Sequence, residues 1–152
     1  MKTKKDFTHI LADAMRRERD AAMFYQQIQE RVTNPAVREI FASLARDEAG
    51  HEQFLMQCQG DPSLFSSIDP HQDYHVATAT DLPVLSLDMK PADAIALAMK
   101  KEQEAVDLYR FLASRATQGK IKALFDGLAT MELSHKNQLE SVFTSIGYPE
   151  VF

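Results

Sequence analysis

One short segment of the chain reads Phe41-Ala-Ser-Leu-Ala-Arg-Asp-Glu-Ala-Gly-His51, and a related segment 84 residues later reads Phe125-Asp-Gly-Leu-Ala-Thr-Met-Glu-Leu-Ser-His135. In both, Phe, Leu, Glu and His follow one another at intervals of three, four and three residues, which places them on one face of an α-helix. Each segment therefore predicts a helix whose apolar face also carries a carboxylate and an imidazole.

The repeat extends into the sequence before each segment. A Glu is followed seven residues later by a Tyr, at Glu18 and Tyr25 and again at Glu102 and Tyr109. Seven residues make about two helical turns, so each Glu shares a face with its Tyr. That face is apolar, and both carboxylates are therefore predicted to be buried. The further identities at this offset are Ala14 and Ala98, Met15 and Met99, Ala21 and Ala105, Arg31 and Arg115, and Thr33 and Thr117.

Helical periodicity covers four segments and predicts an all-α fold. The first two run from about 7 to 60, with a break at which Asn34 can cap a helix that begins with Pro35. The last two run from about 91 to 146, with a break at Gly119. Between them, residues 61–90 have no period and predict a long crossover. We expect a single domain over 1–152, a bundle of two duplicated hairpins.

Composition limits the classes of function. The chain has 152 residues, of which 45% are hydrophobic and 26% charged, and its formal charge is -5. This balance argues against a nucleic-acid partner, and no apolar run approaches the ~18–20 residues that span a membrane. Cys58 is the only cysteine, which excludes an internal disulfide and a CxxC pair. We therefore expect a cytoplasmic protein whose metal chemistry uses carboxylates and imidazoles.

Folding the four helices into a bundle would bring the repeated polar side chains together in its centre. These are Glu18, Glu48, His51, Glu102, Glu132 and His135. Four carboxylates in an apolar interior repel one another and lose their hydration, so they need protons or cations. Two divalent ions would balance their charge, and the mixed oxygen and nitrogen donors suit iron or manganese and tolerate zinc.

The four motifs, Glu18-x6-Tyr25, Glu48-x-x-His51, Glu102-x6-Tyr109 and Glu132-x-x-His135, resemble those of the ferritin-like di-iron carboxylate superfamily, and within it the rubrerythrin-like domain. The resemblance implies a ferritin-like four-helix bundle with two iron ions. It implies that Glu48 and Glu132 bridge the metals, that Glu18 with His51 completes one shell, and that Glu102 with His135 completes the other. Tyr25 and Tyr109 would then hydrogen-bond ligating carboxylates across the bundle.

The chain departs from the rubrerythrin pattern at two points. It has no CxxC pairs of a rubredoxin domain, so electrons are expected from an external donor such as a rubredoxin or a reductase. Ala105 also stands where rubrerythrins tend to have a further Glu, and Glu104 is interpreted as lying off the ligand face. The expected function is peroxide or dioxygen reduction. The alternatives are a ferroxidase or iron-handling protein and a non-enzymatic metal-binding bundle, and a homodimer is left open.

Other polar and sulfur-containing residues are given plain structural interpretations. Asp20, Asp47, Glu52 and Glu104 are interpreted as solvated or edge charges, and the methionines as core filling. Cys58 is interpreted as a partly buried apolar residue. His71 and His75, in the predicted crossover, are interpreted as surface histidines.

Overall fold

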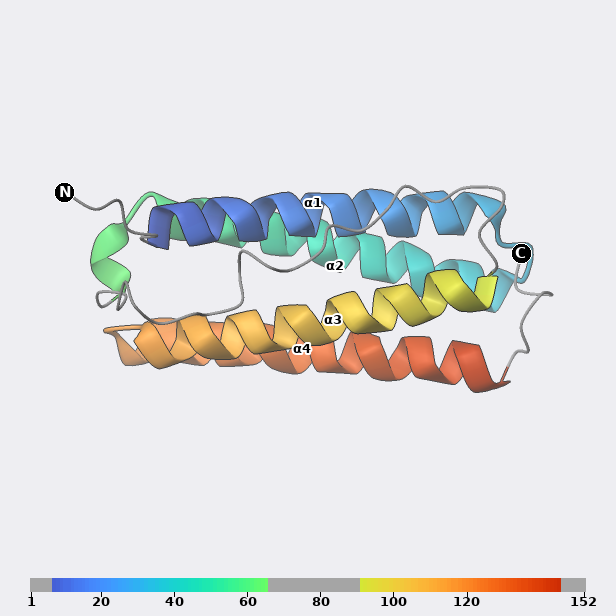
Figure 1. The fold of residues 1–152 in the computed structure, drawn as a ribbon. Coiled ribbons are helices and arrows are strands. Elements are labelled where there is room, and N and C mark those ends of the chain that lie inside the picture. The colour runs from blue at the N-terminus through green and yellow to red at the C-terminus, as the bar shows by residue number, and fades with distance from the viewer. Residues whose placement is uncertain (1–6, 66–90, 146–152) are drawn as a thin grey trace.

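Four long helices form the molecule in a computed structural model that describes residues 7–65 and 91–145. They are α1 (Phe7–Arg31), α2 (Pro35–Gln59), α3 (Pro91–Arg115) and α4 (Gly119–Ser145). Helices α1 and α2 form one antiparallel hairpin, and α3 and α4 form the other (Figure 1). The predicted all-α, four-helix fold is confirmed. No helix in the described part of the chain is long and apolar enough to cross a membrane.

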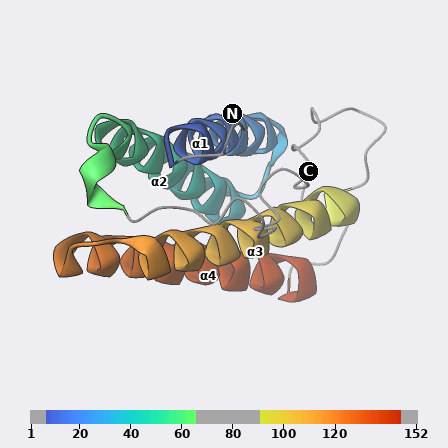
Figure 2. The same ribbon diagram turned by 60° about the vertical axis from the view of Figure 1, so that its left-hand side comes forward.

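The two hairpins lie against each other as two layers (Figure 2). Backbones approach closely within each hairpin and much less between the hairpins, whose contact is made mainly by side chains. Helices α2 and α3 run in the same direction, so the start of α3 lies at the opposite end of the bundle from the end of α2. The part of the predicted crossover at 66–90, with His71 and His75, lies outside the described residues.

The helices begin and end close to where the sequence predicts. Asn34 caps α2, and its side-chain oxygen accepts hydrogen bonds from the backbone N–H groups of Ala36 and Val37 at 2.9 and 3.1 Å. Pro35 occupies the first turn, where its missing N–H costs no helical hydrogen bond. Helix α4 starts at Gly119, the residue that marks the predicted break.

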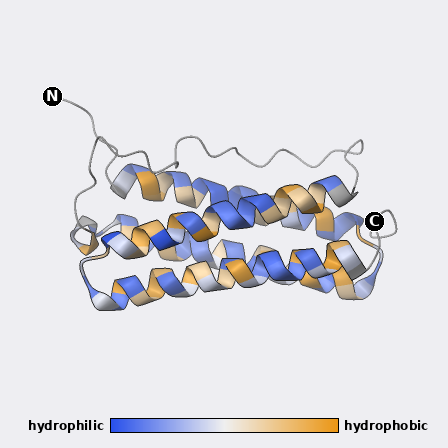
Figure 3. Ribbon diagram, turned by 60° about the horizontal axis from the view of Figure 1, so that its bottom comes forward, coloured by the Kyte–Doolittle hydropathy of each residue, from blue (hydrophilic) through white to orange (hydrophobic). Residues whose placement is uncertain are grey.

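Two apolar clusters fill the bundle, one toward each end. One surrounds the start of α1 and the end of α3 and includes Leu11, Leu112 and Phe125. The other surrounds the end of α1 and the start of α3 and includes Ile28, Ile95 and Leu139. Hydrophilic and hydrophobic residues alternate along the helices (Figure 3). The middle of the bundle, between the clusters, is where the repeated polar residues lie.

The chain just after α2 is tied to the second hairpin. A short 3-10 helix, Pro62–Leu64, leads to Phe65, which is buried and pairs with Ala116 in an antiparallel bridge. The N–H of Thr117 donates to the carbonyl of Leu64 at 2.8 Å, and its hydroxyl donates to the carbonyl of Ser63 at 3.0 Å. The predicted connection therefore begins with residues that pack on the turn between α3 and α4.

Candidate metal centre

The structure brings all six predicted metal-binding side chains together at mid-bundle. Glu18 comes from α1, Glu48 and His51 from α2, Glu102 from α3, and Glu132 and His135 from α4. Each is at most 5% exposed. Side chains three residues apart on one helix point the same way, which is why each Glu-x-x-His pair enters the site together. Their positions match the prediction, while their role as ligands stays a prediction.

These side chains form two overlapping groups of four. Glu18, Glu48, His51 and Glu132 make up the His51 position, and Glu48, Glu102, Glu132 and His135 make up the His135 position. Within each group the potential ligand atoms all lie within 4.8 Å of one another. Both groups contain Glu48 and Glu132, as two ions bridged by these carboxylates would require.

The imidazole Nδ1 atoms point into the cluster. Nδ1 of His51 lies 3.1 Å from an oxygen of Glu48 and 3.3 Å from an oxygen of Glu132. Nδ1 of His135 lies 2.8 Å from Glu132 and 3.6 Å from Glu102. The two rings stack at a centroid separation of 6.2 Å. The Nδ1 atoms are therefore the donor atoms that would face a metal.

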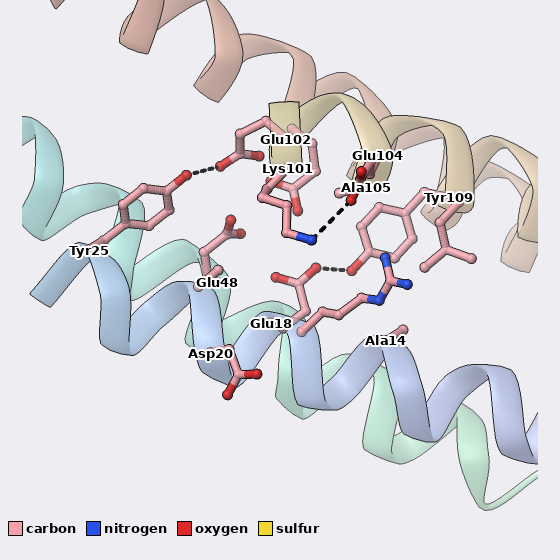
Figure 4. A pocket seen from close by; sticks show the side chains of 14 residues that line it. Ala14, Glu18, Asp20, Tyr25, Glu48, Lys101, Glu102, Glu104, Ala105 and Tyr109 are labelled. Atoms are coloured by element: carbon pink, nitrogen blue, oxygen red, sulfur yellow. Dashed lines mark hydrogen bonds and ion pairs between the residues drawn. The ribbon is translucent and has the colours of Figure 1, made fainter. Parts of the chain in front are cut away.

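Two tyrosines hold carboxylates of the opposite hairpin (Figure 4). The Tyr25 hydroxyl donates to Glu102 at 2.6 Å, and the Tyr109 hydroxyl donates to Glu18. Both phenols are buried at 1% exposure. Burial and the nearby carboxylates raise the pKa of both tyrosines well above its usual value, so both stay protonated and can only donate to these carboxylates. The crossed pattern links the two hairpins at the site.

Without metal, the cluster retains protons. Burial raises the pKa of Glu132 to about 8, together with the charges of Glu18 and Glu102. Burial also raises the pKa of Glu48 well above its usual value, together with the charges of Glu18 and Glu132. Burial alone would lower the pKa of His51 and His135, but hydrogen bonds and charges of adjacent carboxylates outweigh it and raise them to about 10 and about 11. Protons thus neutralise part of the cluster's charge.

The donor set fits two divalent cations. Seven atoms of these six side chains are buried without a well-formed hydrogen bond among the described residues, including Nδ1 of both histidines and both oxygens of Glu132, although both Nδ1 atoms lie at ion-pair distance from carboxylates. Buried polar atoms normally have partners, so this concentration of unpaired donors and acceptors marks a place for a charged ligand. Four carboxylates and two neutral imidazoles would balance two divalent ions with oxygen and nitrogen donors.

The outer ring nitrogens have unlike partners that the sequence interpretation missed. Nε2 of His135 lies 2.9 Å from Oδ2 of Asp47, and Nε2 of His51 lies 3.1 Å from Sδ of Met131. Asp47 was interpreted as a plain edge charge and Met131 as core filling. The second interpretation is wrong, because Met131 is 41% exposed. Both residues directly precede a Glu of the cluster, but this position alone does not show that a side chain reaches a histidine of the other hairpin.

A cavity reaches the carboxylates from the side of α1 and α3. It holds about 40 Å³ of space for water-sized molecules and is lined by Glu18, Glu48, Glu102, Glu132 and both tyrosines. Ala105 also lines it, beside Glu104, whose carboxylate pairs with the Lys101 ammonium at 3.2 Å (Figure 4). One water needs about 10–15 Å³ by this measure, so only a few small molecules fit.

Comparisons with known proteins identify the family and the fold. The rubrerythrin family model matches residues 9–143. A candidate ferritin-like diiron-carboxylate protein of Thermotoga maritima has a similar structure, with a TM-score of 0.80 and 17% identity over 97% of this chain and 100% of that chain. A hypothetical protein of Pyrococcus furiosus has a TM-score of 0.70 and 23% identity over 91% of this chain and 88% of that chain. The two structures show the ferritin-like fold, and the match over residues 9–143 shows that the chain belongs to the rubrerythrin family.

Proposed function

We propose that the protein is a non-haem di-iron oxidoreductase that reduces hydrogen peroxide or dioxygen with electrons from an external donor. The observation that carries this proposal is the pair of overlapping buried groups, each of three Glu and one His, which share Glu48 and Glu132. Two bound iron ions would supply two electrons to an O–O bond. Reduction of one hydrogen peroxide to two water molecules consumes those two electrons and two protons.

The residues of the chain would position the ions and limit what reaches them. Tyr25 and Tyr109 each hold one oxygen of Glu102 and Glu18 respectively, which fixes the orientation of two terminal carboxylates. The apolar clusters at both ends of the bundle exclude bulk water. The small cavity between α1 and α3 favours an oxidant of two heavy atoms over an organic substrate.

The one thiol of the chain is poorly suited to supply the electrons. Cys58 is the single cysteine, and it is 3% exposed at the end of α2, within the apolar cluster. Burial, together with the charge of Asp61, raises the pKa of its thiol to about 11, which disfavours the reactive thiolate. We assign the supply of electrons to a separate protein such as a rubredoxin or a reductase.

Metal analysis and single-turnover kinetics test the proposal. Protein purified without chelator is expected to contain about two transition-metal ions per chain. Iron-loaded protein, reduced without oxygen and mixed with one equivalent of hydrogen peroxide, is expected to reoxidise much faster than free ferrous ion. Fewer than about one metal ion per chain, or reoxidation no faster than in free solution, would contradict the proposal.

The same experiment separates the alternative functions. A ferroxidase would react with dioxygen, release its oxidised iron and turn over with added ferrous ion, whereas the proposed enzyme keeps its iron through the cycle. Light scattering adds a second criterion, since iron storage in a shell requires many subunits. A protein that binds two ions but reacts with neither oxidant would be a metal-binding bundle without oxidoreductase activity.

A further inference from the structure

The two histidines of the metal centre differ in the atom that faces their outer nitrogen. His135 has a carboxylate oxygen of Asp47 at 2.9 Å from Nε2, and His51 has the thioether sulfur of Met131 at 3.1 Å. In both cases Nδ1 points inward to the Glu cluster, so Nε2 is free to donate a hydrogen bond outward. The outer contacts of the two histidines thus occupy equivalent places in the fold, but one partner is a carboxylate and the other is a thioether.

The internal repeat of the chain explains why the places are equivalent. Asp47 and Met131 are 84 residues apart, the offset that relates the two hairpins, and each directly precedes a shared Glu of the cluster. Each reaches across the bundle to the histidine of the other hairpin. The two halves of the site are therefore related by approximate symmetry. The outer contacts of the two histidines depart from that symmetry, because one hairpin has Asp47 where the other has Met131.

A carboxylate and a thioether act differently on a ligating imidazole. An ionised carboxylate accepts a strong hydrogen bond from Nε2–H, which fixes the tautomer and the ring orientation and makes Nδ1 a stronger electron-pair donor. Thioether sulfur is a weak acceptor that does little of this. Removing such a carboxylate partner typically weakens metal binding by about 10–100-fold.

We propose that the two metal positions are unequal, with the His135 position filled first and held more tightly than the His51 position, because Asp47 positions His135 whereas Met131 supports His51 only weakly. The inference rests on the metal centre of the proposed function. Asp47 is a positioning residue, since it acts on the ion through His135. One consequence is that partial metal loss yields a protein with one ion, at the His135 position.

Manganese(II) titration of metal-free protein tests the inference without any redox reaction. Calorimetry and electron paramagnetic resonance are expected to show two binding steps with dissociation constants about 10–100-fold apart. D47N should weaken the tighter step by a similar factor. M131D should tighten the weaker step, and its new carboxylate would stand at a position 41% exposed, where a charge is tolerated.

A double-mutant cycle identifies the residue through which Asp47 acts. The effect of D47N should disappear when His135 is already replaced by Ala and persist when His51 is replaced instead. D126N and M56D serve as controls, because Asp126 pairs with Lys122 on the surface and Met56 is 47% exposed on α2. Circular dichroism confirms that each variant is folded.

Three results would overturn the inference: two equal binding steps in the unmodified protein, a D47N effect that persists without His135, or a folded M131D protein that binds manganese no more tightly. Failure of the proposed function gives a different pattern. A protein that binds manganese in two unequal steps, yet reacts with neither peroxide nor dioxygen when loaded with iron, refutes the oxidoreductase and supports the unequal positions.

Discussion

The Tyr25 hydroxyl donates a 2.6 Å hydrogen bond to the carboxylate of Glu102, a residue 77 positions away on the other hairpin. Tyr109 makes the matching contact with Glu18 in the opposite direction. Each hairpin thus supplies a ligand candidate that the other hairpin orients. The hydrogen bonds join two layers whose backbones approach each other little, and they do so at the level of the metal centre.

Replacing Tyr25 with Phe should weaken both the fold and the site. The change leaves one buried oxygen of Glu102 without its donor, which typically costs about 1–3 kcal/mol of unfolding free energy. Metal affinity should fall as well, since Glu102 loses its fixed orientation. Urea unfolding and manganese titration measure the two effects. Tyr109→Phe should behave alike, and a Tyr25→Phe protein as stable as the unmodified one would show that the hydrogen bond contributes little.

The buried protons predict an unusual pH dependence for the metal-free protein. Folding raises the pKa of four groups, which are Glu132, Glu48, His51 and His135. Their contribution to stability is therefore present at low pH and is lost as pH rises through the raised pKa values. Burial would raise the pKa of Glu102, but hydrogen bonding and charge from His135 outweigh it and lower this pKa. The contribution of Glu102 to the stability of the fold is therefore already complete above about pH 5. The thermal midpoint should therefore fall between about pH 5 and pH 9.

Metal binding should show the opposite dependence on pH. The ligands must lose their protons, so manganese affinity should rise over the same range and each binding event should release protons into the buffer. Calorimetry in buffers of different ionisation enthalpy counts those protons. The stabilisation by metal, taken as the difference between loaded and metal-free thermal midpoints, should be larger at pH 8 than at pH 6. A difference that stays constant between these pH values, with no protons released, would show that the cluster is already deprotonated without metal.

The sequence predicted the inner part of the site because two independent regularities coincide there. Glu18, Glu48, Glu102 and Glu132 lie in phase with apolar stripes and recur at one offset, so burial and duplication both point to the same residues. Helix limits were predictable for local reasons, such as the cap at Asn34. These features depend on neighbours within one helix or on the repeat, both of which a single sequence shows.

The outer contacts of the histidines could not be predicted in the same way. Asp47 and Met131 lie at the edge of their helical faces, half-buried and exposed respectively, where periodicity does not separate a solvent-facing side chain from one that reaches a neighbour. Their partners are 88 and 80 residues away, on the other hairpin. Such contacts depend on how the two hairpins pack, which the pattern within each hairpin does not determine.

Replacing Glu48 and Glu132 together with Ala should abolish metal binding and leave the helices intact. Both carboxylates belong to both groups of four, so each position would retain only one carboxylate and one imidazole. Without metal, the variant should lose the desolvation cost of two mutually repelling carboxylates and also the ion pairs of Glu132 with both imidazoles, so its unfolding free energy should change little. Metal analysis and urea unfolding measure the two results. The matched control replaces the exposed Glu39 and Glu140, and iron binding that survives the first pair would refute the bridging roles.

Enlarging Ala105 should obstruct the cavity without removing a ligand candidate. Ala105 lines the space between α1 and α3 and is absent from both groups of four. The larger side chain of Ala105→Leu would occupy part of a volume of about 40 Å³, so the rate of reoxidation by peroxide should fall by at least about tenfold, equivalent to 1.4 kcal/mol. Manganese affinity should stay the same. Ala123→Leu, at an exposed position of α4, is the matched control. An unchanged reoxidation rate in folded Ala105→Leu protein would show that the oxidant reaches the metals by another route.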